Sequence, residues 1–133
     1  MTLGENTTKA DVIQSFRSHP MAKKALPEGL EDEWFISALA QYELDIDELG
    51  YNATSSEFNS KLKTGTIYTL GLIMYSEYIT RELSRLAKIN GFRGKDIQLT
   101  GSDGSKNITY KDLNLELERV QMLLHKQKIH AYN

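Results

Sequence analysis

The chain has 133 residues, 40% of them hydrophobic and 26% charged, and it contains no cysteine. This composition is typical of one soluble globular domain with a single core, and it excludes a disulfide framework and a thiolate zinc site. The formal net charge of −2 disfavours a dedicated nucleic-acid-binding domain, because such domains usually carry a basic surplus.

Residues 1–29 predict one short helix followed by a connector. Thr7 or Thr8 can cap a helix that runs to about Arg17, because a threonine hydroxyl accepts a hydrogen bond from the first helical turn. Pro20 and Pro27 are the only prolines, so the chain after them is free to form long helices. The apolar side of the short helix would consist of Val12, Ile13 and Phe16.

Residues 30–90 predict a helical core that begins with a helix over residues 30–49. Apolar residues recur there at steps of three or four, which places them on one helix face. The polar stretch "GYNATSSEF" would then form a loop. The apolar stripe of this helix contains Phe35, Ala38, Leu39, Tyr42, Ile46 and Leu49.

The second helix of the core is expected from Phe58 to Asn90, with a weak point near Gly65. It is apolar almost all round from residue 67 to residue 75, which predicts the buried centre of the fold. Gly71 lies inside this part and costs about 1 kcal/mol relative to alanine, so we expect it to mark a close helix crossing. Beyond it the apolar stripe narrows to Ile79, Leu83 and Leu86, and Asn90 with Gly91 would close the helix.

Residues 91–109 predict a β-hairpin, because short alternating apolar stretches flank a Gly/Ser/Asp turn. An isolated two-stranded ribbon is only marginally stable in water. The hairpin would therefore pack on the helices or on a neighbouring molecule. Its apolar residues are Ile97 and Leu99 before the turn and Ile108 and Tyr110 after it.

Residues 110–127 predict an amphipathic C-terminal helix, followed by a tail at residues 128–133. The stripe of this helix contains Leu113, Leu117, Val120 and Leu124. The expected fold class is therefore mostly α. It is a single-domain small helical bundle with one long central helix, a β-hairpin insertion and a C-terminal amphipathic helix.

The stretch "LDIDELGYN", residues 44–52, resembles the start of a calcium-binding EF-hand loop. Asp45, Asp47 and Gly50 fit the first, third and sixth positions of such a loop. Leu49 at the fifth position offers no side-chain ligand, and Ser56 stands where the bidentate glutamate is required. We therefore reject a calcium site and expect Gly50 to close the helix in a left-handed conformation.

Acidic residues are concentrated around this helix, with no Lys or Arg between Lys24 and Lys61. Carboxylates at the start of a helix are favoured by its dipole, whereas those at its end are disfavoured. Two interpretations remain open: a solvated acidic face, or a surface for a basic partner. The cluster is Glu28, Glu31, Asp32, Glu33, Glu43, Asp45, Asp47 and Glu48.

A basic run on and beyond the end of the long helix could be that partner, either within the chain or on a second copy. Separate acidic and basic patches suit a head-to-tail contact between copies, which forms a ring when the rotation closes. Pairing within one chain is the alternative. The run consists of Arg81, Arg85, Lys88, Arg93 and Lys95.

The sequence contains no pattern that predicts catalysis. His19, His125 and His130 are the only histidines, and none has the spacing of a helical metal-binding pair. The stretches "GFRG" and "GSDGS" lack the lysine of a phosphate-binding loop and are interpreted as turns. We therefore expect a protein that is not an enzyme and that needs no cofactor.

An acidic helix ends in "DELGYN", and the long helix "FNSKLKTGTIYTLGLIMYSEYITRELSRL" follows it. A hairpin and an amphipathic C-terminal helix with a short polar tail complete the order of elements. This layout, over residues 31–133, resembles the head-to-tail connector (adaptor) proteins of tailed bacteriophages and prophages of Gram-positive bacteria.

The resemblance implies a structural virion protein that forms a dodecameric ring between the capsid portal protein and a tail or neck stopper protein. Double-stranded DNA would pass through its channel without specific binding, and no membrane would be involved. Portal docking would fall on the C-terminal segment, at His125, Lys126, Lys128, Ile129, His130 and Tyr132.

Contacts between subunits would come from the acidic helix, the basic run and the hairpin. These residues are Glu43, Asp45, Asp47, Glu48, Arg81, Arg85, Lys88, Ile97, Leu99 and Ile108. The expected location is the virion neck, after assembly in the host cytoplasm. The alternative function is a small intracellular helical binding or inhibitor module that docks its acidic helix on a basic partner.

Overall fold

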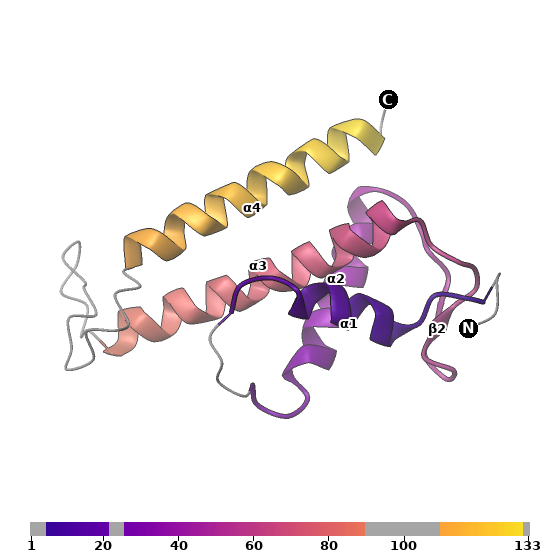
Figure 1. The fold of residues 1–133 in the computed structure, drawn as a ribbon, viewed down its shortest axis with the longest axis horizontal. Helices are drawn as coiled ribbons and strands as arrows, with labels where there is room; N and C mark the ends of the chain where they lie inside the picture. The colour runs from indigo at the N-terminus through magenta and orange to yellow at the C-terminus, as the bar shows by residue number, and fades with distance from the viewer. Residues whose placement is uncertain (1–4, 22–25, 90–109, 132–133) are drawn as a thin grey trace. The chain divides into compact units, whose positions relative to one another are not determined.

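The computed structural model describes residues 5–21, 26–89 and 110–131. Its elements are α1 (Lys9–Arg17), α2 (Leu30–Asp45), β1 (Tyr51–Asn52), β2 (Glu57–Phe58), α3 (Thr64–Ile89) and α4 (Tyr110–Ala131) (Figure 1). The predicted fold class, mostly α with a two-stranded hairpin, is confirmed. The chain divides into two compact units, residues 1–75 with 124–133 and residues 76–123, and a single domain stays a prediction.

The helix α1 begins where the sequence predicts. The Thr8 hydroxyl accepts a hydrogen bond from the Asp11 backbone N–H (3.2 Å), and the Asp11 carboxylate accepts one from the Thr8 N–H (2.9 Å). This reciprocal capping satisfies two backbone donors that the first helical turn leaves without a helical acceptor. Val12 and Phe16 are buried, as the predicted apolar side requires.

An aromatic cluster forms much of the core of the first unit. The ring of Phe35 lies edge-on to those of Tyr51 (5.0 Å between centroids) and Phe58 (6.2 Å). The Phe16 and Trp34 rings also meet edge-on, at 5.7 Å. Such geometries match the charge distribution of the rings and contribute about 0.5–1.5 kcal/mol per pair beyond the burial of area.

The close crossing predicted at Gly71 is confirmed. A Cβ atom at this position would lie 2.7 Å from the Ser15 hydroxyl and 2.9 Å from the Phe16 backbone nitrogen. Only a residue without a side chain lets α1 and α3 approach this closely. The surrounding residues 69–75 are all buried, so this part of α3 is the predicted buried centre.

The helix α2 ends at Asp45, four residues before the predicted end at Leu49. Acidic side chains on either side of this point accept hydrogen bonds from the backbone that follows the helix: Glu43, in the last turn, from the Leu49 N–H (3.1 Å), and Asp47 from the Glu48 N–H (2.8 Å). These local acceptors compete with helix continuation. Gly50 has the expected left-handed conformation (φ +71°), but it opens the hairpin and does not close the helix.

The stretch predicted as a polar loop, residues 50–58, forms the antiparallel hairpin of β1 and β2, so the loop prediction is wrong. Tyr51 pairs with Phe58, and the Asn52 side chain accepts a hydrogen bond from the Thr54 N–H (2.9 Å) inside the turn. The N-terminal segment adds a bond from the Phe58 N–H to the Thr7 carbonyl (2.8 Å). These long-range bonds hold Phe58 in a strand, and the long helix begins at Thr64 and not at Phe58.

The second unit joins the part of α3 after residue 75 to the part of α4 before residue 124. Its buried side chains on α3 include the predicted stripe Ile79, Leu83 and Leu86, and Val120 is fully buried on α4. The other members of the predicted α4 stripe that lie in this unit, Leu113 and Leu117, are half-buried.

The C-terminal helix continues to Ala131, so the prediction that it ends near Gln127 is wrong and residues 128–131 are helical. The predicted hairpin at residues 91–109, with Ile97, Leu99 and Ile108, lies outside the described residues, as does the helix cap at residues 90–91. Tyr110 is the first residue of α4, so the predicted start of the C-terminal helix is confirmed and Tyr110 is not a strand residue.

Candidate interaction site

The end of α2 and the end of α4 meet in the first unit through one ion pair. Lys128 Nζ lies 2.9 Å from an oxygen of the Asp45 carboxylate, and each side chain is a little under half exposed. The sequence analysis assigned Asp45 to subunit contacts and Lys128 to portal docking. The structure brings the two side chains together within one chain, and both assignments to a partner stay predictions.

A small pocket lies beside this ion pair, and its volume of about 40 Å³ is far below the roughly 300–1,000 Å³ of typical small-molecule sites. It can hold a water molecule, whose share of liquid volume is about 30 Å³. The lining comes from α2, the first half of α3 and the end of α4: Gln41, Tyr42, Asp45, Ile46, Thr69, Ile73, Leu124 and Lys128. This place is therefore a packing junction that fixes the end of α4.

Two acids in the first turn of α2 are neutralised by cations from α1. Lys9 Nζ lies 2.6 Å from Asp32, and Arg17 forms a two-pronged pair with Glu31 at 2.6 and 2.9 Å. The hydrogen bond and the negative charge of Glu31 raise the pKa of the Arg17 guanidinium above its ordinary value. These acids hold α1 against α2, and their negative charges also interact favourably with the positive end of the α2 helix dipole.

Four of the other acids of the cluster are exposed to solvent. Glu28, Glu33, Asp47 and Glu48 are exposed, and none of them forms an ion pair with another described residue. Glu43 is half-buried because its carboxylate accepts the hydrogen bond from Leu49. The acidic surface around α2 is thus smaller than the sequence suggested, and it concentrates at Glu33 and at the segment after the helix.

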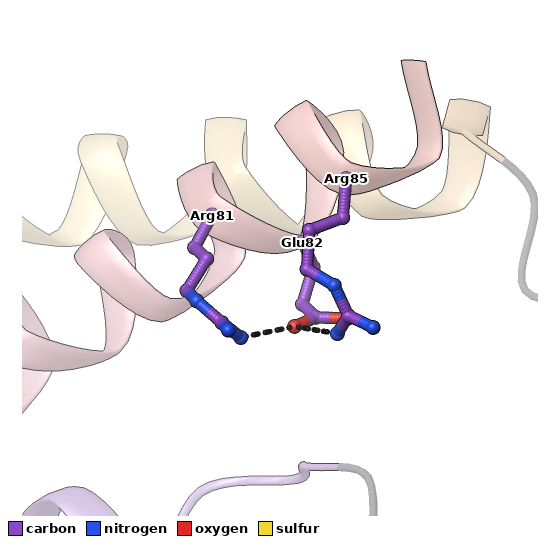
Figure 2. A network of polar contacts seen from close by, with 3 residues as sticks. All are labelled: Arg81, Glu82 and Arg85. Atoms are coloured by element: carbon purple, nitrogen blue, oxygen red, sulfur yellow. Dashed lines mark hydrogen bonds and ion pairs between the residues drawn. The ribbon is translucent and has the colours of Figure 1, made fainter. Parts of the chain in front are cut away.

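The basic run on α3 is partly neutralised by a residue of the same helix. Figure 2 shows Glu82 between Arg81 and Arg85, whose Nη1 atoms lie 3.4 and 3.1 Å from its carboxylate. Lys88 is exposed and forms no ion pair with another described residue. Arg93 and Lys95 lie outside the described residues, so the predicted run is represented here by one arginine pair and one lysine.

Sequence reasoning missed a set of exposed apolar side chains on two helices. Ile36 and Leu44 on α2 are 55% and 85% exposed, and Leu115 and Met122 on α4 are 53% and 62% exposed. Apolar periodicity was used to find the buried stripe of each helix, and these residues fall outside it. The available signal was a second apolar stripe at residues 36, 40 and 44, in steps of four.

Five of the six residues predicted to dock on a portal lie on the last two turns of α4. His125 and Lys126 are exposed, while Lys128 is held by Asp45. The backbone of Ile129 and His130 is helical, and Tyr132 lies outside the described residues. As far as residue 131, the predicted docking segment is therefore the end of a helix.

Within residues 5–21, 26–89 and 110–131, no group of three His, Asp or Glu side chains could hold a metal ion. None of the helices in the described part of the chain is both long and apolar enough to cross a membrane.

Comparison with protein-family models gave no match for this chain. Searches against curated proteins and against solved structures likewise found no similar protein.

Proposed function

We propose that the chain is a structural subunit of a phage head-to-tail connector, which assembles into a ring between the capsid portal and the next neck or tail protein. The observation that carries this proposal is the exposed face of α2. There the side chain of Leu44 is 85% exposed. Glu33 on the helix, and Asp47 and Glu48 just after it, form no ion pair with a described residue.

Such a face is suited to a protein partner. Exposed apolar side chains gain about 25 cal/mol for each Å² that a contact removes from water, and the neighbouring charges select a partner of opposite sign. A subunit that must bind its neighbours in a ring needs surfaces of this kind. The proposal is also supported by the order of the helices along the chain, which resembles that of the connector proteins.

The proposal is tested by co-expressing the chain with a phage portal protein from the same genome and isolating the portal through an affinity tag. We expect the chain to be retained with the portal. A variant that ends at Lys128 keeps the ion pair to Asp45 and removes only residues 129–133. If the segment after Lys128 contributes to docking, this variant is retained less. Retention at the level of the full chain would refute that part of the docking assignment.

The acidic end of α2 also supports the second candidate, a small binding or inhibitor module that docks on a basic partner. For such a module, neutralising Asp47 and Glu48 as Asp47→Asn and Glu48→Gln would abolish binding, and the chain would not self-assemble under any condition. Self-association of the chain, alone or on a portal, distinguishes the connector from this module.

A further inference from the structure

Four of the five large hydrophobic side chains that are exposed in the described residues lie on just two helix faces. On α2 they are Ile36 and Leu44, and on α4 they are Leu115 and Met122. Single exposed apolar residues are common on protein surfaces, whereas apolar residues aligned on one helix face are typical of contact surfaces. The two faces are therefore candidate contact surfaces for another molecule.

The first surface, which we name the acidic apolar face, comprises Glu33, Ile36, Ala40 and Leu44 of α2. These residues follow each other at steps of three, four and four, so they lie on one side of the helix, and all of them are exposed. Directly after the helix, the chain carries the exposed carboxylates of Asp47 and Glu48, so acidic residues follow this face at its C-terminal end. Its most exposed apolar side chain, Leu44, lies at that end.

The second surface, the basic apolar face, comprises Lys111, Leu115, Arg119, Met122 and Lys126 of α4. Its steps of four, four, three and four also trace one side of a helix, and all five residues are exposed. Arg119 is bonded to Glu116 at 2.9 Å, and acids flank the face only in its first half. Since no Asp or Glu follows residue 118, the face becomes basic toward its C-terminal end.

The two faces match in both spacing and charge. Ile36 and Leu44 are separated by eight residues, about 12 Å along a helix, and Leu115 and Met122 by seven residues, about 11 Å. A parallel arrangement places Leu44 against Met122 and Ile36 against Leu115 at once. The same arrangement brings the acidic end of one face to the basic end of the other.

We propose that the acidic apolar face of one copy docks on the basic apolar face of a second copy, with Leu44 packed against Met122. Every copy carries both faces, so the contact joins different surfaces of identical subunits and can continue from copy to copy. This contact presupposes the self-assembly proposed above and identifies the surfaces through which it occurs. Burial of Leu44 drives the association, and the flanking charges set the parallel orientation.

Single-cysteine variants test the contact directly, because the natural chain has no cysteine. The variants Leu44→Cys and Met122→Cys are prepared separately, mixed and exposed to mild oxidation, with and without the portal protein. A disulfide between positions 44 and 122 then joins two different molecules by construction. Circular dichroism of each variant verifies the helical content, and replacing either variant by Ser84→Cys, at an exposed position on α3, provides the matched control.

We expect disulfides between positions 44 and 122 to form in clear excess over random pairing. In mixtures that contain the Ser84→Cys control, we expect disulfides only at the level of random pairing. A parallel test with Leu115→Cys should give fewer disulfides to position 44, because the opposite orientation would favour that pair. We also expect Leu44→Gln to weaken self-association about tenfold, whereas Ser84→Gln leaves it unchanged.

Assembly of the chain, observed by light scattering, together with random pairing of positions 44 and 122 would overturn the proposed contact and leave the connector function standing. Failure to assemble in any condition, with the portal or without it, would overturn both. A preference for disulfides between positions 44 and 115 would overturn the parallel arrangement and the pairing of Leu44 with Met122.

Discussion

Lys128 and Asp45 form an ion pair of 2.9 Å that ties the last turns of α4 to the end of α2 within the first unit. Each side chain is a little under half exposed, so water and salt screen the pair. The pair therefore positions the end of α4 more than it stabilises the fold. The carboxylate of Asp45 and the ammonium group of Lys128, both predicted from the sequence to contact partners, thus neutralise each other within the chain.

We predict that a double-mutant cycle of Asp45→Asn and Lys128→Met gives a coupling free energy below about 1 kcal/mol, as expected for exposed ion pairs. Denaturant unfolding of the four proteins measures it. The matched control pairs Lys128→Met with Asp32→Asn, whose carboxylate contacts Lys9 instead. A coupling of several kcal/mol for Asp45 with Lys128, or a significant one in the control, would contradict this assignment.

The crossing of α1 and α3 predicts that two glycine-to-alanine substitutions in α3 change the free energy of unfolding differently. Gly71→Ala should lower the free energy of unfolding by about 1–3 kcal/mol, because its Cβ meets backbone and side-chain atoms of α1 within 3 Å. Gly65→Ala meets no atom within 4 Å and should be neutral or stabilise α3 by up to about 1 kcal/mol. Thermal unfolding of both variants checks this, and an unchanged Gly71→Ala protein would refute the close crossing.

The capping interaction at the start of α1 predicts that removing the Thr8 hydroxyl lowers the free energy of unfolding measurably. Thr8→Ala removes the acceptor for the Asp11 N–H and should reduce the free energy of unfolding by about 1 kcal/mol. Gln14→Ala, at an exposed position of the same helix, is the control and should change it little. Equal losses in the two variants, measured by urea unfolding, would show that the cap does not contribute.

The difference in burial between two large apolar residues predicts very different losses of stability when each is replaced by alanine. Phe58 is fully buried in the aromatic cluster, so Phe58→Ala should cost about 3–5 kcal/mol and release the hairpin. Leu44 is 85% exposed, and Leu44→Ala should change the free energy of unfolding of the monomer by less than about 0.5 kcal/mol. Comparable losses in the two variants would show that Leu44 belongs to the core.

Local signals in the sequence were sufficient for α1 and for the centre of α3. The Thr8 cap acts within three residues, and the apolar residues around Gly71 indicate burial wherever the partner helix lies. The hairpin of β1 and β2 could not be predicted in this way. Its position depends on backbone bonds from Thr7 and on the packing of Phe58 against Phe35, which are distant in sequence.

The candidate site was only partly predictable for the same reason. Residue type and spacing located the start of the acidic helix, although it ends at Asp45 and not at Leu49. They could not show that Lys9 and Arg17 neutralise its first turn, that Lys128 binds Asp45, or that Glu82 lies between two arginines. The pairing of charges is a property of three-dimensional packing.

Native mass spectrometry of the chain mixed with a phage portal protein from the same genome tests the proposed function most directly. We expect a complex in which several copies of the chain are bound to each portal assembly, and fewer copies when Leu44→Gln replaces the natural chain. A chain that remains monomeric at high protein concentration and low salt, and that binds no portal, would contradict it.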